Sequence, residues 1–128
     1  MTKSLLLVPA LLGVVGLAHA GARADQEVVI LHGKVEQASG SVLAARERAD
    51  DVQGIGCMLQ PGAGAEPEAT CSAQDSNYDR LQCVTRDPQH IKIIASISHS
   101  SGITFVVGKG GNCSYVSVSN GSWYGSSR

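Results

Sequence analysis

Four cysteines are the residues of this sequence whose spacing says most about their chemistry. Cys57, Cys71, Cys83 and Cys113 follow one another at intervals of 14, 12 and 30 residues. Zinc sites usually draw on close pairs such as Cys-x-x-Cys, and these intervals are much wider. An even number of widely spaced cysteines in a small exported chain is typical of disulfides. We therefore expect two disulfides, no metal site and no cofactor.

Four cysteines allow three pairings. We favour Cys83–Cys113 together with Cys57–Cys71, because the segment from 83 to 113 holds a helix start, the richest run of large aliphatic residues and a strand. Joining its two ends would close a helix-and-strand unit against which the rest of the chain packs. The alternative pairing is Cys71–Cys83 with Cys57–Cys113.

Histidine and serine residues offer one possible catalytic group. Around His99 lie Ser96, Ser98, Ser100 and Ser101. Nucleophilic catalysis by serine also needs an oriented base and an oxyanion site, and no Gly-x-Ser-x-Gly elbow is present. His32, His90 and His99 show no metal-ligand spacing. We assign no catalytic residue and favour a protein that is not an enzyme, with a small hydrolase using His99 and a nearby serine as an alternative.

Aromatic residues are few, namely one Trp, three Tyr and one Phe, so the adjacent pair Trp123 and Tyr124 stands out. Exposed aromatic side chains often anchor protein partners or sugars. The pair is therefore our candidate for binding, and its other interpretation is a cover for the end of the core.

Charge excludes two classes of partner. Ten Lys and Arg oppose eleven Asp and Glu, which gives a formal net charge of −1, and the basic residues are scattered among the acidic ones. A nucleic-acid binder usually carries a basic patch, and a peripheral membrane protein a polybasic cluster. We expect neither partner, and we expect instead an unidentified protein or surface partner.

The amino terminus has the anatomy of a secretory signal peptide over residues 1–20. Lys3 precedes an apolar run from Leu5 to Leu17, which ends in Ala18-His19-Ala20. This run is shorter than the roughly 20 residues that span a bilayer, and small residues suit the cleavage position. We expect cleavage after Ala20, with Ala24 as the alternative. Residues 21–128 then form a single small domain that is secreted or periplasmic and free of the membrane.

The remaining patterns predict the elements of this domain. Apolar and β-branched runs predict strands over 27–36, 54–59, 69–73, 81–84, 103–107 and 113–119. Asp87-Pro88 is a helix start signal, and it favours a helix over 88–98 rather than a further strand. Residues 60–68 hold two prolines and two glycines and predict a mobile loop. Residues 42–52 fit either a short helix or irregular structure.

Strand alternation leaves one question open near the carboxyl end. In a regular strand over 113–119, Cys113 lies on the face opposite Val116 and Val118. If the valines meet the predicted helix, either the disulfide lies on the other face of the sheet or the strand bulges near Asn112.

Together these patterns predict an α+β domain, with a small antiparallel sheet of about five or six strands, one helix over 88–98 on one face and two disulfides. Its leading function is an exported, non-catalytic binding or interaction domain. An inhibitor of an exported hydrolase is a narrower alternative, with residues 60–68, closed off by Cys57 and Cys71, as its contact loop.

A series of short motifs also resembles small exported bacterial proteins that contain disulfides and whose function is uncharacterised. The motifs are Ile55-Gly56-Cys57, Thr70-Cys71-Ser72-Ala73 with Asp75, Cys83 followed by Asp87-Pro88, Phe105, and Cys113 leading to Val116-Ser117-Val118-Ser119-Asn120. The resemblance implies secretion, disulfides and a mixed strand and helix layout, and it implies no activity or site residue.

Overall fold

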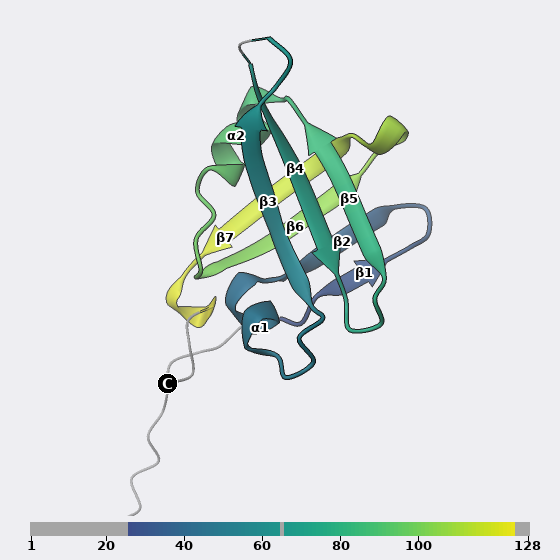
Figure 1. Cartoon of the computed structure of the whole chain (residues 1–128), viewed down its shortest axis with the longest axis vertical. Coiled ribbons are helices and arrows are strands. Elements are labelled where there is room, and N and C mark those ends of the chain that lie inside the picture. The colour runs from purple at the N-terminus through teal and green to yellow at the C-terminus, as the bar shows by residue number, and fades with distance from the viewer. Residues whose placement is uncertain (1–25, 65, 125–128) are drawn as a thin grey trace, which may run out of the picture.

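The computed structural model describes residues 26–64 and 66–124. Within these residues, seven strands form two antiparallel sheets that pack against each other, with two short helices at their margins (Figure 1). The elements are β1 Val29–Leu31, β2 Glu36–Ser41, α1 Val42–Glu47, β3 Gly54–Pro61, β4 Pro67–Gln74, β5 Arg80–Thr85, α2 Pro88–Ile94, β6 Ser101–Val107 and β7 Cys113–Asn120. Two 3-10 turns follow β6 and β7, at Lys109–Gly111 and Ser122–Tyr124.

The fold is α+β, as the sequence predicts, but the strands form two sheets rather than one. One sheet has the order β1-β2-β6-β7, and the other is the meander β3-β4-β5. Ala69, Cys71 and Ala73 of the central strand β4 are almost fully buried. A single helix of seven residues cannot cover a whole sheet, so the second sheet is needed to remove these side chains from water.

The core between the sheets is built mainly from small side chains. Phe105 and Ile103 are its largest fully buried residues, and alanines and cysteines fill much of the remainder. Hydrophobic stabilisation follows buried apolar area. A core of this composition gives a small domain little reserve, which is where covalent cross-links contribute most.

The first predicted strand, over 27–36, is wrong in its extent. The chain turns after Leu31, and β2 begins at Glu36 and continues to Ser41, pairing with β6. The exposed turn at residues 32–35 contains Gly33 and Val35, and this valine, after the apolar run 28–31, gives the sequence the pattern of one continuous strand.

Both interpretations of residues 42–52 hold in part. Ser41 ends β2 and also begins α1, because its hydroxyl oxygen accepts a hydrogen bond from Ala44 N at 3.3 Å. The helix ends at Glu47, and irregular backbone leads to β3.

Helix α2 begins where the sequence predicts and ends earlier. The Asp87 carboxylate accepts a hydrogen bond from Gln89 N at 2.8 Å, and Pro88 takes the first helical position. The expected end at residue 98 is wrong, because the backbone tightens after Ile94 and Ser96 donates its hydroxyl to Ile93 O at 2.7 Å. None of the helices in the described part of the chain has the length and apolar character required to cross a lipid bilayer.

A bulge resolves the orientation of Cys113. Val106 pairs with Tyr115 and Val107 with Cys113, so Ser114 is an extra residue in β7. The extra residue returns Cys113 to the face that carries Val116, and both side chains are buried. Of the two alternatives that strand alternation left open, the bulge is therefore the correct one. The disulfide faces the core rather than the back of the sheet.

Of the loop expected over 60–68, only the two ends are strand, because β3 runs to Pro61 and β4 begins at Pro67. Strands β3 and β4 stay in register as far as the pair Pro61 and Pro67, and only the turn beyond them is irregular. The Cα atoms of the register partners Cys57 and Cys71 lie 4.0 Å apart, which marks a pair without mutual backbone hydrogen bonds. Pairs of this kind alternate along the ladder, so the two prolines occupy such a pair and need no N–H.

Candidate functional site

The two disulfides support the sheet that carries the candidate site. Cys57 bonds to Cys71 and Cys83 bonds to Cys113, so the favoured pairing is confirmed and the alternative is wrong. The first bond joins the neighbouring strands β3 and β4, and the second joins β5 to β7 across the two sheets. The three-stranded sheet and the four-stranded sheet are thereby tied into one unit.

The outward face of the three-stranded sheet carries an open trough of about 490 Å³. Gly54, Gln74 and Arg80 are register partners and form one cross-strand row. The next row is Gly56, Ser72 and Gln82, and Met58 closes the trough beyond it. Strand alternation places these side chains opposite the buried Ala73, Cys71 and Cys83.

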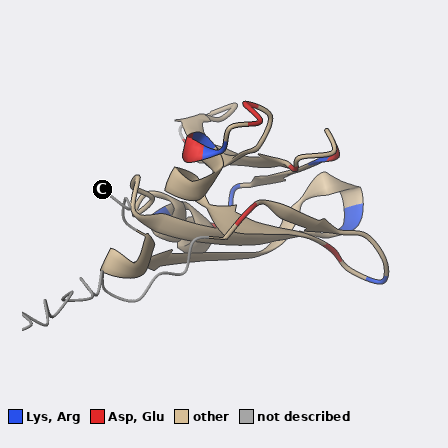
Figure 2. Cartoon of the chain, turned by 90° about the horizontal axis from the view of Figure 1, so that it is seen from below, with Lys and Arg blue, Asp and Glu red and all other residues tan. Residues whose placement is uncertain are grey.

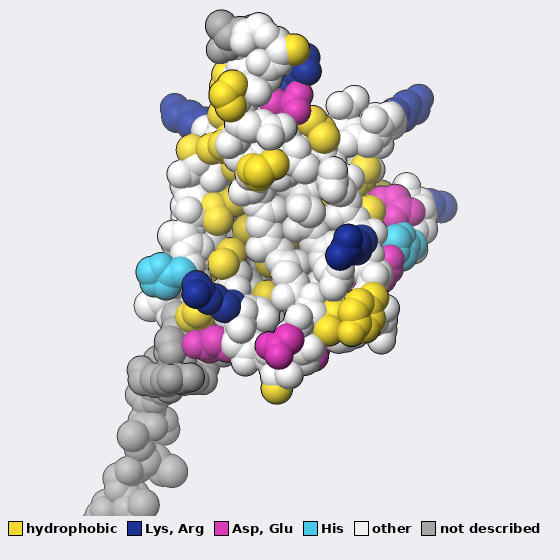
Figure 3. Space-filling model, viewed as in Figure 1, with side chains coloured by type: hydrophobic (Ala, Val, Ile, Leu, Met, Phe, Trp, Pro, Cys, Tyr) yellow, Lys and Arg dark blue, Asp and Glu magenta, His cyan; other side chains and the backbone are white. Residues whose placement is uncertain are grey.

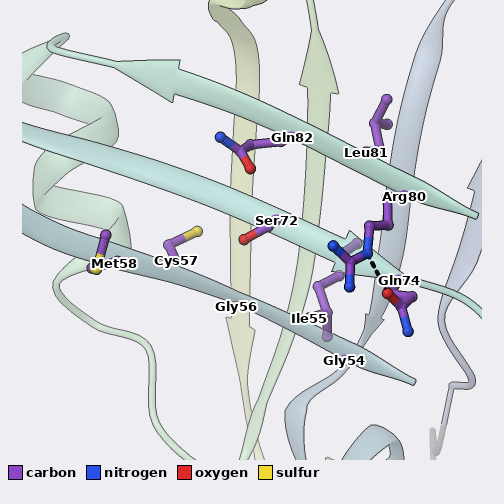
Figure 4. Close-up of a pocket in the computed structure, with 11 residues that line it drawn as sticks. Gly54, Ile55, Gly56, Cys57, Met58, Ser72, Gln74, Arg80, Leu81 and Gln82 are labelled. Atoms are coloured by element: carbon purple, nitrogen blue, oxygen red, sulfur yellow. Dashed lines mark hydrogen bonds between the residues drawn. The ribbon is translucent and has the colours of Figure 1, made fainter. Parts of the chain in front are cut away.

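The trough exists because two glycines occupy alternate positions of β3. An ideal Cβ on Gly54 or Gly56 would have no atom within 4 Å, so the space above both residues is open. Met58 lies at one end of this part of β3, and Gln74 and Arg80 lie beside Gly54 at the other end (Figure 4). In the space-filling view, backbone and uncharged polar side chains dominate the centre of this face (Figure 3). Beside Met58 and the exposed backbone, the surface thus offers the hydroxyl of Ser72 and the amides of Gln74 and Gln82.

Arg80 supplies the charge of the trough. It is the only charged residue among those that line the trough, and its Nε donates a hydrogen bond to Gln74 Oε1 (Figure 4). Within residues 26–64 and 66–124, no ion pair neutralises it. Most other charged residues lie on turns and helices, away from the strands (Figure 2). An arginine fixed at Nε keeps its terminal N–H groups available for a planar acceptor such as a carboxylate.

The predicted binding residues Trp123 and Tyr124 lie elsewhere. They belong to the 3-10 turn after β7, with their ring centroids 6.0 Å apart in an edge-to-face arrangement. Tyr124 covers Gly102 of β6 so closely that a Cβ there would lie 2.5 Å from its ring, and Trp123 covers Gly121 in the same way. Tyr124 is partly buried and Trp123 is 42% exposed. Both rings thus contact glycines of the four-stranded sheet and the turn that follows it.

The residues of the hydrolase alternative are separated by their contacts. Ser101 is fully buried, donates its hydroxyl to Asn120 Oδ1 and accepts a hydrogen bond from Ser98 N at 2.8 Å. His99 is exposed, and among the described residues no hydrogen bond joins it to a serine or an acidic group. These contacts hold the start of β6 in place and form no nucleophile–base pair.

The other histidines take part in structural contacts. His90 Nδ1 lies 2.9 Å from the hydroxyl of Thr85, which is buried before α2. His32 contacts Glu36, and its Nε2 lies 2.5 Å from Asp79 Oδ2. Hydrogen bonds to Asp79, and then to Glu36, raise the pKa of His32. In the part of the chain that the structure describes, no cluster of three or more His, Cys, Asp or Glu side chains is arranged to hold a metal ion.

The trough was not found from the sequence, although a signal for it was present. Gly54 and Gly56 are two residues apart in a strand, so they share a face. The two glycines form a trough only because Ser72 and Gln82 lie in the same cross-strand row as Gly56. That row requires the pairing of three strands. Comparison of the chain with protein-family models, curated proteins and solved structures found no match.

Proposed function

We propose that this chain is an exported, non-catalytic binding domain that holds its ligand in the trough of the three-stranded sheet. The observation that carries the proposal is Arg80, a cation without an acidic partner among the described residues, beside an open floor of glycines. Such an arrangement fits an extended polar ligand that presents a carboxylate, with Ser72 and Gln82 as hydrogen-bonding groups.

The rigidity of the surface also supports binding. Cys57–Cys71 links two of the three strands below the trough, and Cys83–Cys113 ties the third to the other sheet. A ligand that meets a preformed surface loses less free energy to ordering the protein. The same disulfides are typical of proteins that mature in an oxidising compartment, which supports export. The predicted signal peptide lies outside the described residues, and amino-terminal sequencing of exported protein should place its cleavage after Ala20.

A fragment screen followed by NMR tests the position of the site while the natural ligand is unidentified. The disulfide-bonded protein, labelled with ¹⁵N, is titrated with fragments that carry carboxylates, amides or sugar hydroxyls. We expect carboxylate fragments to shift the amide signals of Gly54, Gly56, Ser72 and Gln82. Shifts confined to the region of Trp123 and Tyr124 would contradict the proposal.

Two arginine variants separate a specific contact from general charge. Arg80→Gln should weaken binding of the carboxylate fragments by about tenfold, which corresponds to one charge-assisted contact. Arg86→Gln is the matched control, because Arg86 lies just beyond β5 and already pairs with Glu68 at 2.8 Å. Equal losses in both variants would mean that Arg80 has no particular role.

The two alternative functions remain hypotheses with less support from the described contacts. A hydrolase using His99 would need a rearrangement that brings the exposed imidazole to a serine. An inhibitor of an exported hydrolase would present the end of the β3–β4 hairpin, which projects beyond the rest of the domain (Figure 1). Loss of turnover in His99→Ala would support the hydrolase. Inhibition of a member of a protease panel would support the inhibitor.

A further inference from the structure

The outer edge of β3 presents backbone groups that have no partner within the described residues. Because Cys57 and Cys71 form a pair without mutual backbone bonds, the residues on either side of Cys57 direct their N–H and C=O groups into the sheet. Ile55, Cys57 and Leu59 must then direct theirs outward. The helices α1 and α2 contact β3, but no described hydrogen bond joins them to these groups.

Apart from its contacts with α1 and α2, this edge lacks the features that usually protect an exposed strand. Natural edges are short, bulged, covered or charged. The edge strand β1 is three residues long, β7 packs against α2, and β5 is bridged by Asn112 at Val84. Strand β3 is eight residues long, keeps an unbroken register with β4 and contains no charged residue. Only Pro61 at its end has a protective character.

Two large apolar side chains on β3 are exposed close to this edge. Met58 is 57% exposed and Leu59 is 43% exposed, on opposite faces of the strand. An uncharged strand with free backbone groups and exposed apolar side chains is a ready template for another strand.

We infer that two copies of this chain pair through β3 in antiparallel orientation, with a two-fold axis at Cys57. This register sets Cys57 opposite Cys57 of the second copy and Ile55 opposite Leu59 of the second copy. Their outward N–H and C=O groups then form the hydrogen-bonded pairs of an antiparallel ladder. The two three-stranded sheets become one sheet of six strands.

The side chains of β3 are complementary to themselves in this register. On the outward face, Met58 lies opposite Gly56 of the second copy, whose open surface leaves room for it, so dimerisation competes with a ligand for the space above Gly56. On the other face, Ile55 and Leu59 form an apolar cross-strand pair. No like charges meet along β3, because the strand carries none. A second copy therefore meets both the backbone and the side chains, whereas an unrelated extended peptide is assured only of the backbone contacts.

Sedimentation equilibrium of the disulfide-bonded protein, from micromolar to millimolar concentration, tests this pairing. We expect a reversible dimer. Met58→Lys, which places a charge at the edge, should raise the dimer dissociation constant by about tenfold or more. Gln82→Lys is the matched control, because Gln82 is exposed on the same face but lies on β5, two strands from this edge, and this variant should dimerise like the wild type.

Two further measurements keep the result specific. Leu59→Pro removes an outward N–H without removing a β3–β4 hydrogen bond, so it should weaken the dimer while circular dichroism and intact disulfides show that the fold is kept. In a mixed-label dimer, an intermolecular nuclear Overhauser effect should join the Met58 methyl group to Gly56 Hα. A monomer at every concentration, a dimer that Met58→Lys leaves unchanged, or strand pairing only with an added peptide would each overturn the inference.

Discussion

The two disulfides of this domain join very different places. Cys57–Cys71 connects residues that already face each other in the β3–β4 ladder, and the Cys57 end is only partly buried. Cys83–Cys113 connects β5 to β7, which belong to different sheets, and a backbone bridge beside it joins Val84 of β5 to Asn112, the residue before β7. Cys83 is 1% exposed and Cys113 is 8% exposed, so this bond lies within the core.

Loop length alone would make the two bonds nearly equal. For sequence separations of 14 and 30, the chain-entropy treatment gives about 3.0 and about 3.6 kcal/mol. The surroundings differ more, because both inter-sheet cysteines are buried, whereas of the other pair Cys71 is buried and Cys57 is only partly so. Among the described residues, Phe105 and Ile103 are the only large side chains that are fully buried, so the inter-sheet sulfur atoms fill part of a small core. Position in the core, more than loop length, should therefore decide which cross-link matters more.

The largest effect should follow removal of the inter-sheet bond. Cys83→Ala with Cys113→Ala should lower the free energy of unfolding by about 4–5 kcal/mol, because the lost cross-link is added to a loss of core packing. Equilibrium denaturation in guanidinium chloride, without a reducing agent so that Cys57–Cys71 stays intact, measures this change. A loss equal to that of the other pair would refute the role of core position.

A smaller loss should follow removal of the bond within the sheet. Cys57→Ala with Cys71→Ala should lower the free energy of unfolding by about 2–3 kcal/mol, since the hairpin ladder remains. The same denaturation experiment gives the value. Two-dimensional NMR should still show the cross-strand contacts between β3 and β4, and their loss would mean that the disulfide holds the hairpin together.

The smallest effect concerns a polar tie between the sheets. His32, in the turn between β1 and β2, contacts Asp79, in the turn between β4 and β5. The hydrogen bonds to Asp79 and Glu36 raise the pKa of His32 above its ordinary value of 6.5. Its stabilising effect is therefore complete below pH 6.5 and disappears as the pH rises through the raised pKa of the folded protein.

Thermal unfolding of wild type and His32→Asn across this pH range measures the tie. The higher melting temperature of the wild type relative to the variant should disappear as the pH rises. Because both proteins contain His90 and His99, the contributions of these residues cancel in the difference between the two melting temperatures. The change should be slight, because the contact is exposed and screened by solvent. A difference that does not vary with pH would show that the charged form of His32 has no part in it.

Several elements could be predicted because their signals are local. Asp87-Pro88 begins α2 through a cap and a preset backbone angle, which neighbouring residues alone provide. The strands around Leu81 and Phe105 follow from short runs of apolar residues between turns. The end of α2 was not predictable in the same way, because Ile91, Ile94 and Ile97 continue a helical pattern while the backbone leaves the helix to reach β6.

The candidate site depends on information that is not local. Gly54 and Gly56 are visible in the sequence, but the trough forms only where β4 and β5 bring Ser72, Gln82 and Arg80 beside them. The aromatic pair Trp123 and Tyr124, conspicuous by composition, lies outside the trough and covers two glycines, and its role in binding stays a prediction. Composition identifies unusual residues, whereas register determines which of them share a surface.

The order of residues along the chain was enough to favour the observed disulfide pairing and to predict the capped start of α2 and strands at the places of β3, β4, β5, β6 and β7. Each of these depends on residues close together or on the number and spacing of cysteines. The division of the strands into two sheets, and the orientation of Cys113 toward the core, arise only when the whole domain packs. The extra residue Ser114 shifts alternation by one position, and the burial of Cys83, Cys113 and Val116 between two layers favours that shift.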